Sequence, residues 1–174
     1  MGAKASIMDH ASMERAITRI SHEIIEKNKG TENLIVVGIG RKGIPFAEKL
    51  GGRISSIEDR RIDVECIDIQ GYRDDVDRDN TDKFVFGFDI EDKIIILADD
   101  VLYTGRTVRA ALDAIVHNGR PKKVQLAVLI DRGHREFPIR PDFVGKNVPT
   151  SRDERIKVVF DENDSKVLIE KAEE

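Results

Sequence analysis

Three short apolar runs constrain the fold of this chain most. They are "NLIVVGIG" at 33–40, "KIIILA" at 93–98 and "VQLAVLI" at 124–130. A run of this length without polar alternation is typical of a strand that is buried on both faces. Segments with helical spacing of apolar residues lie between the runs. Alternating strands and helices predict an α/β fold, with a mostly parallel central sheet flanked by helices.

The expected helices are recognised by their spacing and their ends. Asp9 is placed to cap a first helix, in which apolar side chains recur at helical spacing from Met13 to Ile24, and Gly30 follows its end. Further helices are expected at 44–55, where Pro45 suits a first turn, and from about 104 to 118. Additional strands are expected at 61–69, 156–160 and 166–170, with a small hairpin strand at 84–88. The rest of the last 44 residues reads as irregular.

The length of 174 residues predicts a single domain spanning 1–174. The polar segment 71–83 is expected to be a mobile loop, and long loops in compact domains are usually functional. Apolar runs of only a few residues exclude a membrane-spanning helix. The single cysteine, Cys66, excludes an internal disulfide and a cysteine-cluster zinc site, and it predicts a cytoplasmic location.

The segment "TGRT", Thr104 to Thr107, has the features of a phosphate cradle. It follows a buried strand and opens a helix, so several backbone N–H groups lack intrahelical partners. Gly105 permits close approach of a ligand, and the helix dipole adds partial positive charge. Two threonine hydroxyls can donate hydrogen bonds, and Arg106 brings a full charge. The segment is therefore expected to bind a phosphate group.

Asp99 and Asp100 stand directly before this segment, and like charges keep them from binding the same phosphate. Carboxylates accept hydrogen bonds from the vicinal hydroxyls of a sugar and can orient a hydrated Mg²⁺. Acceptors for a diol beside a phosphate cradle indicate a ribose 5-phosphate. The alternative is that Thr104 only caps a helix and the aspartates form a solvated turn. In a parallel sheet, residues 99–107 and 38–43 are expected side by side at one rim.

Two other nucleotide-binding motifs resemble parts of the chain. "IIILADD" resembles a strand that serves Mg²⁺ in nucleotide hydrolases, but the required G-x-x-x-x-G-K-[ST] loop is absent. "GIGRKG" at 38–43 matches the dinucleotide pattern G-x-G-x-x-G, which leaves a Rossmann oxidoreductase as an alternative. Two cations inside this turn, Arg41 and Lys42, fit a strongly anionic group such as pyrophosphate better than a dinucleotide.

The segment "ILADDVLYTGRTVRAALDAI" resembles the phosphoribosyl pyrophosphate (PRPP) signature of type I phosphoribosyltransferases. "RAITRISHEIIEKNKG", "YRDD" and "RPKKVQLAVLIDRGHREFPIRPDFVGKNVPTS" extend the resemblance over nearly the whole chain, to the PyrR family. This resemblance implies a type I phosphoribosyltransferase fold with a small hood and a mobile active-site loop. It also implies two activities: conversion of uracil and PRPP to UMP and pyrophosphate, and UMP-dependent binding of pyr leader mRNA that controls transcription attenuation.

The resemblance assigns roles to individual residues. Asp99 and Asp100 would hold the ribose hydroxyls, with Mg²⁺ held mainly through PRPP rather than by direct ligation. Arg41, Lys42 and Gly43 fall where the family places its pyrophosphate loop. Family members often carry Thr-Arg-Gly there, and Lys lacks the planar fork of Arg. Tyr72 and Arg73 would begin the mobile loop. The residues expected to wrap the 5-phosphate are Val101, Leu102, Tyr103, Thr104, Gly105, Arg106 and Thr107.

The expected RNA surface depends mainly on the resemblance. Residues 132–152 carry five Lys and Arg against two acids, in a chain of net charge −4. Composition alone favours an ordinary solvated face or an oligomer contact as the explanation of that excess. Aromatic residues are sparse, so RNA recognition would depend on phosphates and shape. The family positions associated with RNA match Thr18, Arg19, His22, Arg135, Arg140 and Lys146.

Two further expectations complete the interpretation. The resemblance implies a homodimer or a higher homo-oligomer without membrane attachment. The alternative function is a phosphoribosyltransferase that acts on another nucleobase and has no RNA regulation.

Overall fold

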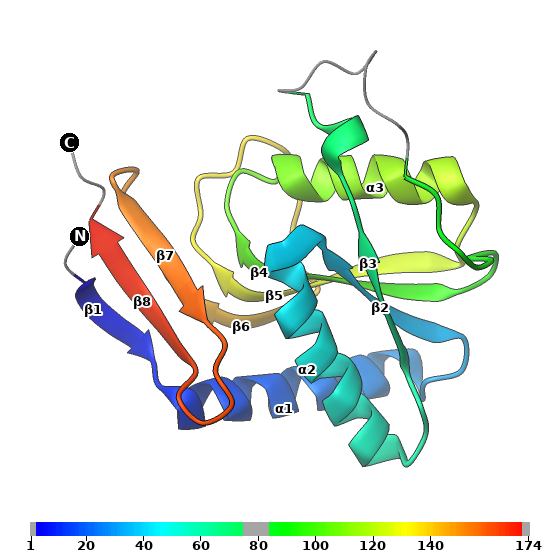
Figure 1. Cartoon of the computed structure of the whole chain (residues 1–174), viewed down its shortest axis with the longest axis horizontal. Coiled ribbons are helices and arrows are strands. Elements are labelled where there is room, and N and C mark those ends of the chain that lie inside the picture. Colours follow the sequence, from blue (N-terminus) through cyan, green and yellow to red (C-terminus); the bar gives the residue numbers. More distant parts are fainter. Residues whose placement is uncertain (1–2, 75–83, 172–174) are drawn as a thin grey trace.

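The computed structural model describes residues 3–74 and 84–171, which form two sheets (Figure 1). The larger is a five-stranded parallel sheet of order β3-β2-β4-β5-β6, and the smaller is a three-stranded antiparallel sheet of order β1-β8-β7. The strands of the larger sheet are β2 (Leu34–Ile39), β3 (Asp63–Ile67), β4 (Ile94–Leu102), β5 (Lys123–Asp131) and β6 (Phe143–Asn147). Those of the smaller are β1 (Ala3–Met8), β7 (Glu154–Val159) and β8 (Lys166–Lys171).

The apolar runs form the centre of the parallel sheet, as predicted. Every residue of β2 is buried, and so are the first six of β4. The two strands pair in register, with Gly38 opposite Ala98. The carboxyl ends of both strands therefore reach the same rim of the sheet.

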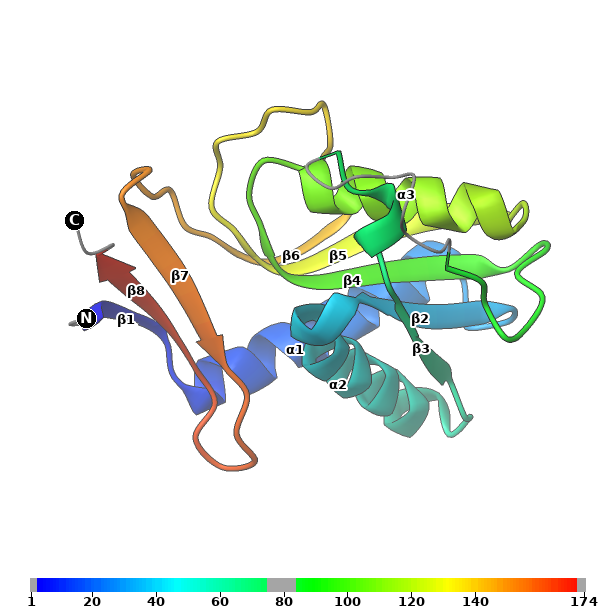
Figure 2. The same ribbon diagram turned by 45° about the horizontal axis from the view of Figure 1, so that its top comes forward.

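Helices cover both faces of this sheet (Figure 2). Helices α1 (His10–Asn28) and α2 (Gly40–Glu58) bury their apolar residues in one core cluster with one face of the sheet. Helix α3 (Arg106–Asn118) belongs to a second cluster on the other face. The predicted cap of α1 is confirmed: Asp9 Oδ1 accepts a hydrogen bond of 2.8 Å from the Ser12 N–H. Among the described residues, no helix has the length and hydropathy needed to cross a membrane.

The smaller sheet stands beside the carboxyl ends of β4 and β5 in both ribbon views (Figures 1 and 2). It brings β1, near the start of the chain, against β8, near its end, with Ser6 opposite Leu168. Its position matches the expected small hood of a type I phosphoribosyltransferase. The rim that carries the predicted phosphate cradle is thus flanked by a second layer of structure.

Two strands were not predicted. β1 has the weak pattern "AKASIM" and forms by pairing with β8. β6, "FVGKN", lies at an edge of the parallel sheet, where Gly145 packs so closely that a Cβ there would lie 2.4 Å from the Leu129 carbonyl oxygen. The interpretation of the tail as mostly irregular was therefore wrong at 143–147.

The hairpin strand expected at 84–88 is absent from the described structure. The Phe86 N–H donates to Asn118 Oδ1 over 2.7 Å, and the Asn118 side-chain amide donates to the Phe84 carbonyl oxygen over 3.0 Å. The Asn118 side chain, at the end of α3, thus makes the hydrogen bonds to the backbone of this segment that a neighbouring strand would make in a hairpin. The three aromatic rings of the segment pack on one another in sequence.

Two element boundaries differ from the prediction in ways that concern the site. α2 begins at Gly40 rather than at residue 44, so Arg41 and Lys42 lie in its first turn and Pro45 lies inside the helix. β4 continues through Asp99 and Asp100 to Leu102, so the aspartates belong to a strand. The larger part of the expected mobile loop, 75–83, lies outside the described residues.

Candidate active site

The turn between β4 and α3 has the backbone of an anion cradle. Gly105 has a φ of +92°, a conformation that favours glycine, and it stands immediately before the first residue of α3. The Thr104 carbonyl oxygen accepts hydrogen bonds from Glu136 N–H, at 2.8 Å, and from Phe137 N–H, at 3.1 Å. These bonds fix the turn against the segment that follows β5. The Arg106 N–H, at the start of α3, donates to Thr104 Oγ1 over 3.4 Å, so the Thr104 side chain also caps the helix.

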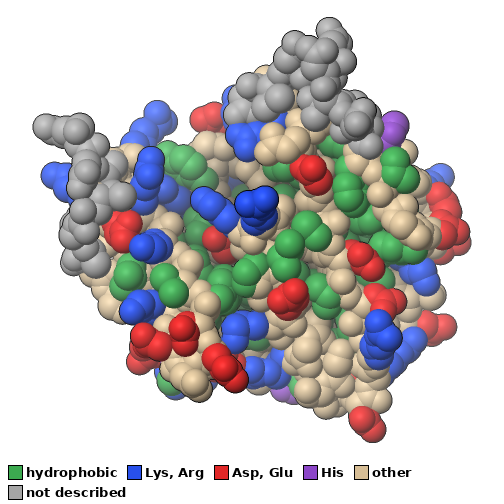
Figure 3. Space-filling model, in the orientation of Figure 1, with side chains coloured by type: hydrophobic (Ala, Val, Ile, Leu, Met, Phe, Trp, Pro, Cys, Tyr) green, Lys and Arg blue, Asp and Glu red, His purple; other side chains and the backbone are tan. Residues whose placement is uncertain are grey.

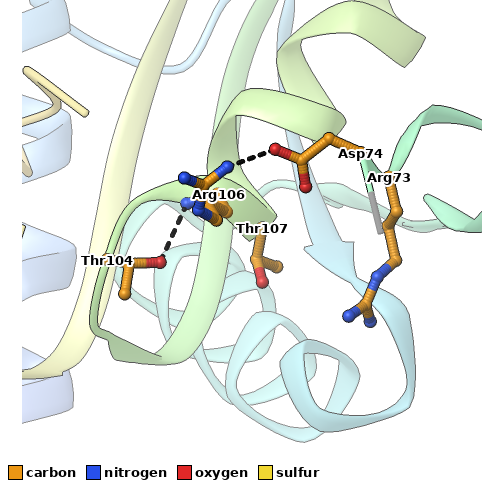
Figure 4. Close-up of a pocket in the computed structure, with 5 residues that line it drawn as sticks. All are labelled: Arg73, Asp74, Thr104, Arg106 and Thr107. Atoms are coloured by element: carbon orange, nitrogen blue, oxygen red, sulfur yellow. Dashed lines mark hydrogen bonds and ion pairs between the residues drawn. The ribbon is translucent and has the colours of Figure 1, made fainter. Parts of the chain in front are cut away.

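A cavity of about 450 Å³ opens at this turn. It is lined by Arg73, Asp74, Thr104, Arg106 and Thr107, which Figure 4 shows as sticks. Three of the predicted cradle residues therefore share one cavity with Arg73 and Asp74. The position at a helix N-terminus, two threonine hydroxyls and two arginines suit a phosphate group.

Asp99 and Asp100 lie at the end of the neighbouring strand and differ in exposure. Asp99 is 6% exposed, whereas Asp100 is half-buried. Asp99 Oδ1 accepts a hydrogen bond of 2.9 Å from the Asp100 N–H, and Asp100 Oδ1 accepts one of 2.8 Å from the Val101 N–H. Each carboxylate thus holds the backbone N–H of the next residue.

Burial changes the acidity of both groups. It raises the pKa of Asp99 well above its usual value, and the nearby negative charge of Asp100 raises that pKa further. Burial also raises the pKa of Asp100, against the opposing effect of its hydrogen bonds with Asp99 and Val101. The positive charge of Lys42 lowers both pKa values. A lysine in the first turn of α2 therefore acts electrostatically on the acid pair.

The expected pyrophosphate loop meets the acid pair through backbone contact. A Cβ atom on Gly43 would lie 2.7 Å from the Ala98 carbonyl oxygen, so only glycine fits there. The predicted juxtaposition of 38–43 with 99–107 at one rim is confirmed. Arg41 and Lys42 are exposed, and Figure 3 shows Lys and Arg side chains over this end of α2.

Other predicted residues lie outside the cavity lining. Tyr72 is 5% exposed, packs into the core near His117 and precedes the cavity residue Arg73. Burial raises the pKa of its hydroxyl. Leu102 is 2% exposed and Val101 packs against the first core cluster, so these two can offer a ligand mainly their backbone. Tyr103 lies under the guanidinium of Arg132, 4.0 Å from its ring centre.

Four of the six expected RNA residues gather on α1 and β6. Arg19 donates to the carbonyl oxygens of Val144 and Gly145, at 3.0 and 2.7 Å, and joins the two elements. His22 is exposed one turn further along α1, and Lys146 is exposed on β6. Thr18 is half-buried, and its hydroxyl oxygen accepts a hydrogen bond from Arg53.

The other two RNA candidates lie in the segment that joins β5 to β6. Arg140 is exposed there. Arg135 instead donates to the Tyr103 carbonyl oxygen at 2.6 Å, the Ile139 carbonyl oxygen at 2.8 Å and Asp131 Oδ2 at 2.8 Å. It therefore supports the turn between β4 and α3.

Sequence reasoning missed three residues of the site. Asp74 and Glu136 both contact the Arg106 side chain, from 32 and 30 residues away along the chain. Arg132 is 7% exposed, and its guanidinium donates to Thr150 Oγ1 and to the carbonyl oxygens of Ser151 and Glu154. The "YRDD" and "DRGHRE" segments were noted for their resemblance, but no local pattern indicates these contacts.

No group of three or more His, Cys, Asp or Glu in the described ranges is arranged to hold a metal ion. The acid pair offers carboxylate oxygens at the rim, which suit a hydrated Mg²⁺ that a phosphorylated ligand brings with it. The donor set fits that mode and does not fit an all-protein cage.

Comparison with known proteins gives three findings. The model of the phosphoribosyl transferase domain family matches residues 4–162. A protein of Clostridium kluyveri named bifunctional protein PyrR is 57% identical over 167 residues, which are 94% of each chain. A protein of the same name from Pelotomaculum thermopropionicum is 55% identical, with 98% of each chain covered.

Solved structures with the same fold are more distant in sequence. A hypoxanthine-guanine phosphoribosyltransferase from Bacillus anthracis aligns with a TM-score of 0.69 at 18% identity, covering 90% of this chain and 87% of the other. A hypoxanthine phosphoribosyltransferase from Trypanosoma cruzi, in complex with IMP, aligns with a TM-score of 0.68 at 16% identity, covering 86% and 78%. At these identities the likeness concerns the fold.

Proposed function

Since the chain belongs to the phosphoribosyltransferase family and, within it, to the PyrR proteins, we propose that it has two activities. The first is an enzymatic activity that converts uracil and PRPP to UMP and pyrophosphate. The second is the regulation of pyr mRNA in response to UMP. The single observation that carries the enzymatic proposal is the meeting of three features at one rim. They are the phosphate cavity at 104–107, the acid pair Asp99 and Asp100, and the basic first turn of α2.

The three features correspond to the three parts of PRPP. The cradle takes the 5-phosphate at the start of α3. The acid pair accepts hydrogen bonds from the ribose hydroxyls, with Asp100 the more accessible of the two. Arg41 and Lys42 face the pyrophosphate, with Gly43 allowing α2 to approach β4. One ligand thus uses both the acidic and the basic groups of the site.

The reaction is a displacement at the anomeric carbon. The bond from this carbon to the pyrophosphate oxygen breaks and pyrophosphate leaves with the electron pair, while the bond to uracil N1 forms and the N1 proton passes to water. Positive charge develops on the sugar and negative charge on the leaving group. Asp99 and Asp100 stabilise the former through the sugar they hold, and Arg41 and Lys42 stabilise the latter.

Arg73 lines the cavity from the side opposite the turn. Tyr72 contributes by anchoring Arg73, because its ring is held in the core. When bound through PRPP, Mg²⁺ would neutralise part of the pyrophosphate charge. The carboxylates of the rim would orient the water around that ion rather than bind it directly.

A transfer assay with each nucleobase tests the enzymatic proposal. Purified protein is mixed with PRPP and uracil, hypoxanthine, guanine or orotate, with and without Mg²⁺, and nucleotide formation is measured. UMP formation that requires Mg²⁺ is expected. Transfer to another base, and none to uracil, would favour the alternative of a different nucleobase specificity.

The regulatory half of the proposal is supported by the basic residues on α1 and β6. Arg19, His22 and Lys146 are exposed on two packed elements, and Arg19 also pairs with Glu23 over 2.9 Å. Exposed cations at fixed spacing suit an RNA backbone. Arg140 adds a further exposed cation, whereas Arg135 acts through the phosphate turn.

Gel-shift titrations with a pyr leader RNA test the regulator. UMP is expected to tighten binding, and higher salt is expected to weaken it. Lys146→Ala should lower RNA affinity and reduce the salt slope by about one phosphate contact. Lys157→Ala is a control that removes an exposed cation of β7. Equal affinity with and without UMP would contradict the regulatory proposal.

The homo-oligomer implied by the resemblance stays a prediction. Sedimentation equilibrium over a range of protein concentrations would measure the mass of the assembly directly. A single species at the monomer mass would contradict it.

A further inference from the structure

Arg106, the cation of the phosphate cradle, already holds two carboxylates in the described structure. Its Nη1 donates to Asp74 Oδ2, and its Nε donates to Glu136 Oε1 over 2.9 Å. Its guanidinium also lies over the Phe137 ring, 4.8 Å from the ring centre. Both carboxylates come from segments distant in sequence, and Figure 4 shows Asp74 reaching Arg106 across the cavity.

The two carboxylates differ in their position. Asp74 lines the cavity, as Arg106 does, whereas Glu136 is exposed and is not among the lining residues. Glu136 is also fixed by its backbone, because its N–H donates to the Thr104 carbonyl oxygen. Glu136 therefore orients Arg106 from outside the cavity, and Asp74 occupies the side of the guanidinium that faces the ligand space.

A phosphate entering the cavity would meet the Asp74 carboxylate at this arginine. Carboxylate and phosphate oxygens bind a guanidinium with the same charge-assisted geometry, so the two compete for the same donors. With Asp74 in place, the charge of Arg106 is balanced before the ligand arrives, and the repulsion between two anions opposes a third. Asp74 must move away from Arg106 before the arginine can bind a phosphate fully.

We propose that Asp74 is an internal competitor for the phosphate-binding arginine: its carboxylate holds Arg106 in the ligand-free protein, and the 5-phosphate of the ligand displaces it. This inference rests on the proposed function, since it takes the cavity at 104–107 to be the site of the 5-phosphate. It makes Asp74 a determinant of affinity for phosphorylated ligands. The residue lowers this affinity, although it lies inside the site.

Isothermal titration calorimetry with UMP and with uridine tests the proposal. Asp74→Asn keeps the shape of the side chain and removes its charge, and Asp74→Ala removes the competing group. Both variants should bind UMP about two- to fivefold more tightly than the wild type, the range for the loss of an exposed ion pair. Uridine, which has no phosphate, should bind all three proteins equally.

Asp113→Asn is the matched control. It removes the same charge from a carboxylate of α3 that pairs with Arg109 at 3.1 Å, and Asp113 does not line the cavity. Its affinity for UMP should equal that of the wild type. If the loss of any nearby negative charge strengthened UMP binding, Asp113→Asn would also bind UMP more tightly than the wild type. This result would overturn the proposal.

Arg106→Ala separates failure of this inference from failure of the proposed function. If Arg106→Ala weakens UMP binding while both Asp74 variants leave it unchanged or weaken it, competition by Asp74 is wrong and the cradle stands. If Arg106→Ala leaves UMP affinity unchanged, the phosphate cradle itself is wrong, and the inference about Asp74 falls with it.

Discussion

A Cβ atom on Gly43 would lie 2.7 Å from the carbonyl oxygen of Ala98, closer than side-chain carbons approach backbone oxygens. This contact joins the first turn of α2 to the strand that carries the acid pair. It sets how near Lys42 can come to Asp99 and Asp100, whose pKa values the lysine lowers. The close approach at Gly43 therefore also determines how strongly Lys42 lowers the pKa values of the two aspartates.

Gly43→Ala is expected to lower both stability and transferase activity. The added methyl group must push α2 away from β4, and overpacking of this kind costs about 1–3 kcal/mol in the free energy of unfolding. Urea unfolding measures the stability, and the UMP-forming assay measures the activity. Gly52→Ala on the same helix is the control, because nothing lies within 4 Å of a Cβ placed there. A Gly43→Ala protein as stable as this control would contradict the close contact.

Asp99→Asn and Asp100→Asn are each expected to lower phosphoribosyl transfer by ~10² or more, as for a lost preorganised electrostatic contact. Initial rates at saturating uracil and PRPP measure the loss, and circular dichroism verifies folding. The control is Asp113→Asn, which makes the same chemical change on α3. Wild-type rates in both variants would remove the acid pair from the active site.

The raised pKa of Asp99 predicts how stability depends on pH. Burial favours the neutral acid, so the folded protein retains a proton that the unfolded chain releases. The contribution of Asp99 to the free energy of unfolding is therefore fully present below the ordinary aspartate pKa of about 4. It is lost as the pH rises through the higher pKa of the folded state. Asp99→Asn lacks this titration, so its stability relative to the wild type should improve as pH rises. Urea unfolding of both proteins across pH 4–8 measures the difference, and a constant difference would contradict the prediction.

Arg135→Ala is expected to lower the free energy of unfolding by about 1–3 kcal/mol, since it removes charge-assisted hydrogen bonds to Tyr103, Ile139 and Asp131. Arg140→Ala in the same segment removes an exposed cation and should change stability by less than about 0.5 kcal/mol. Thermal and urea unfolding of the pair measure the contrast. Equal stability in the two variants would show that Arg135 does not support the turn.

Local sequence patterns predicted the central strands of the parallel sheet, but they could not predict elements that depend on distant partners. The run 93–98 has to be buried on both faces, so its place in the centre of a parallel sheet follows from composition alone. β1 could not be found in this way, because "AKASIM" becomes a strand only by pairing with β8, more than 150 residues along the chain. The segment 84–88 has strong strand composition, but Asn118 takes its backbone hydrogen bonds.

The site divides along the same line. Asp99, Asp100 and the turn 104–107 lie in one short segment, so a site could be predicted there from the local sequence alone. The partners of Arg106 were not, since Asp74 and Glu136 reach it from two other segments. For the same reason Arg135 reads as a surface cation in sequence, whereas its guanidinium lies against the Tyr103 backbone. Side chains whose partners are distant in sequence are therefore where the prediction of roles was incomplete.

Arg132 connects two parts of the molecule that the chain itself joins only through a long segment. Its guanidinium stacks on Tyr103, beside the turn 104–107, and donates hydrogen bonds to Thr150, Ser151 and Glu154 at the start of β7. Substitutions of Tyr103 and Thr150 will therefore not contribute independently to the free energy of unfolding. In a double-mutant cycle the cost of the second change will depend on whether the first has already released the shared cation. Arg132 thus couples the residues that follow β4 of the larger sheet to those at the start of β7 of the smaller sheet in the free energy of unfolding.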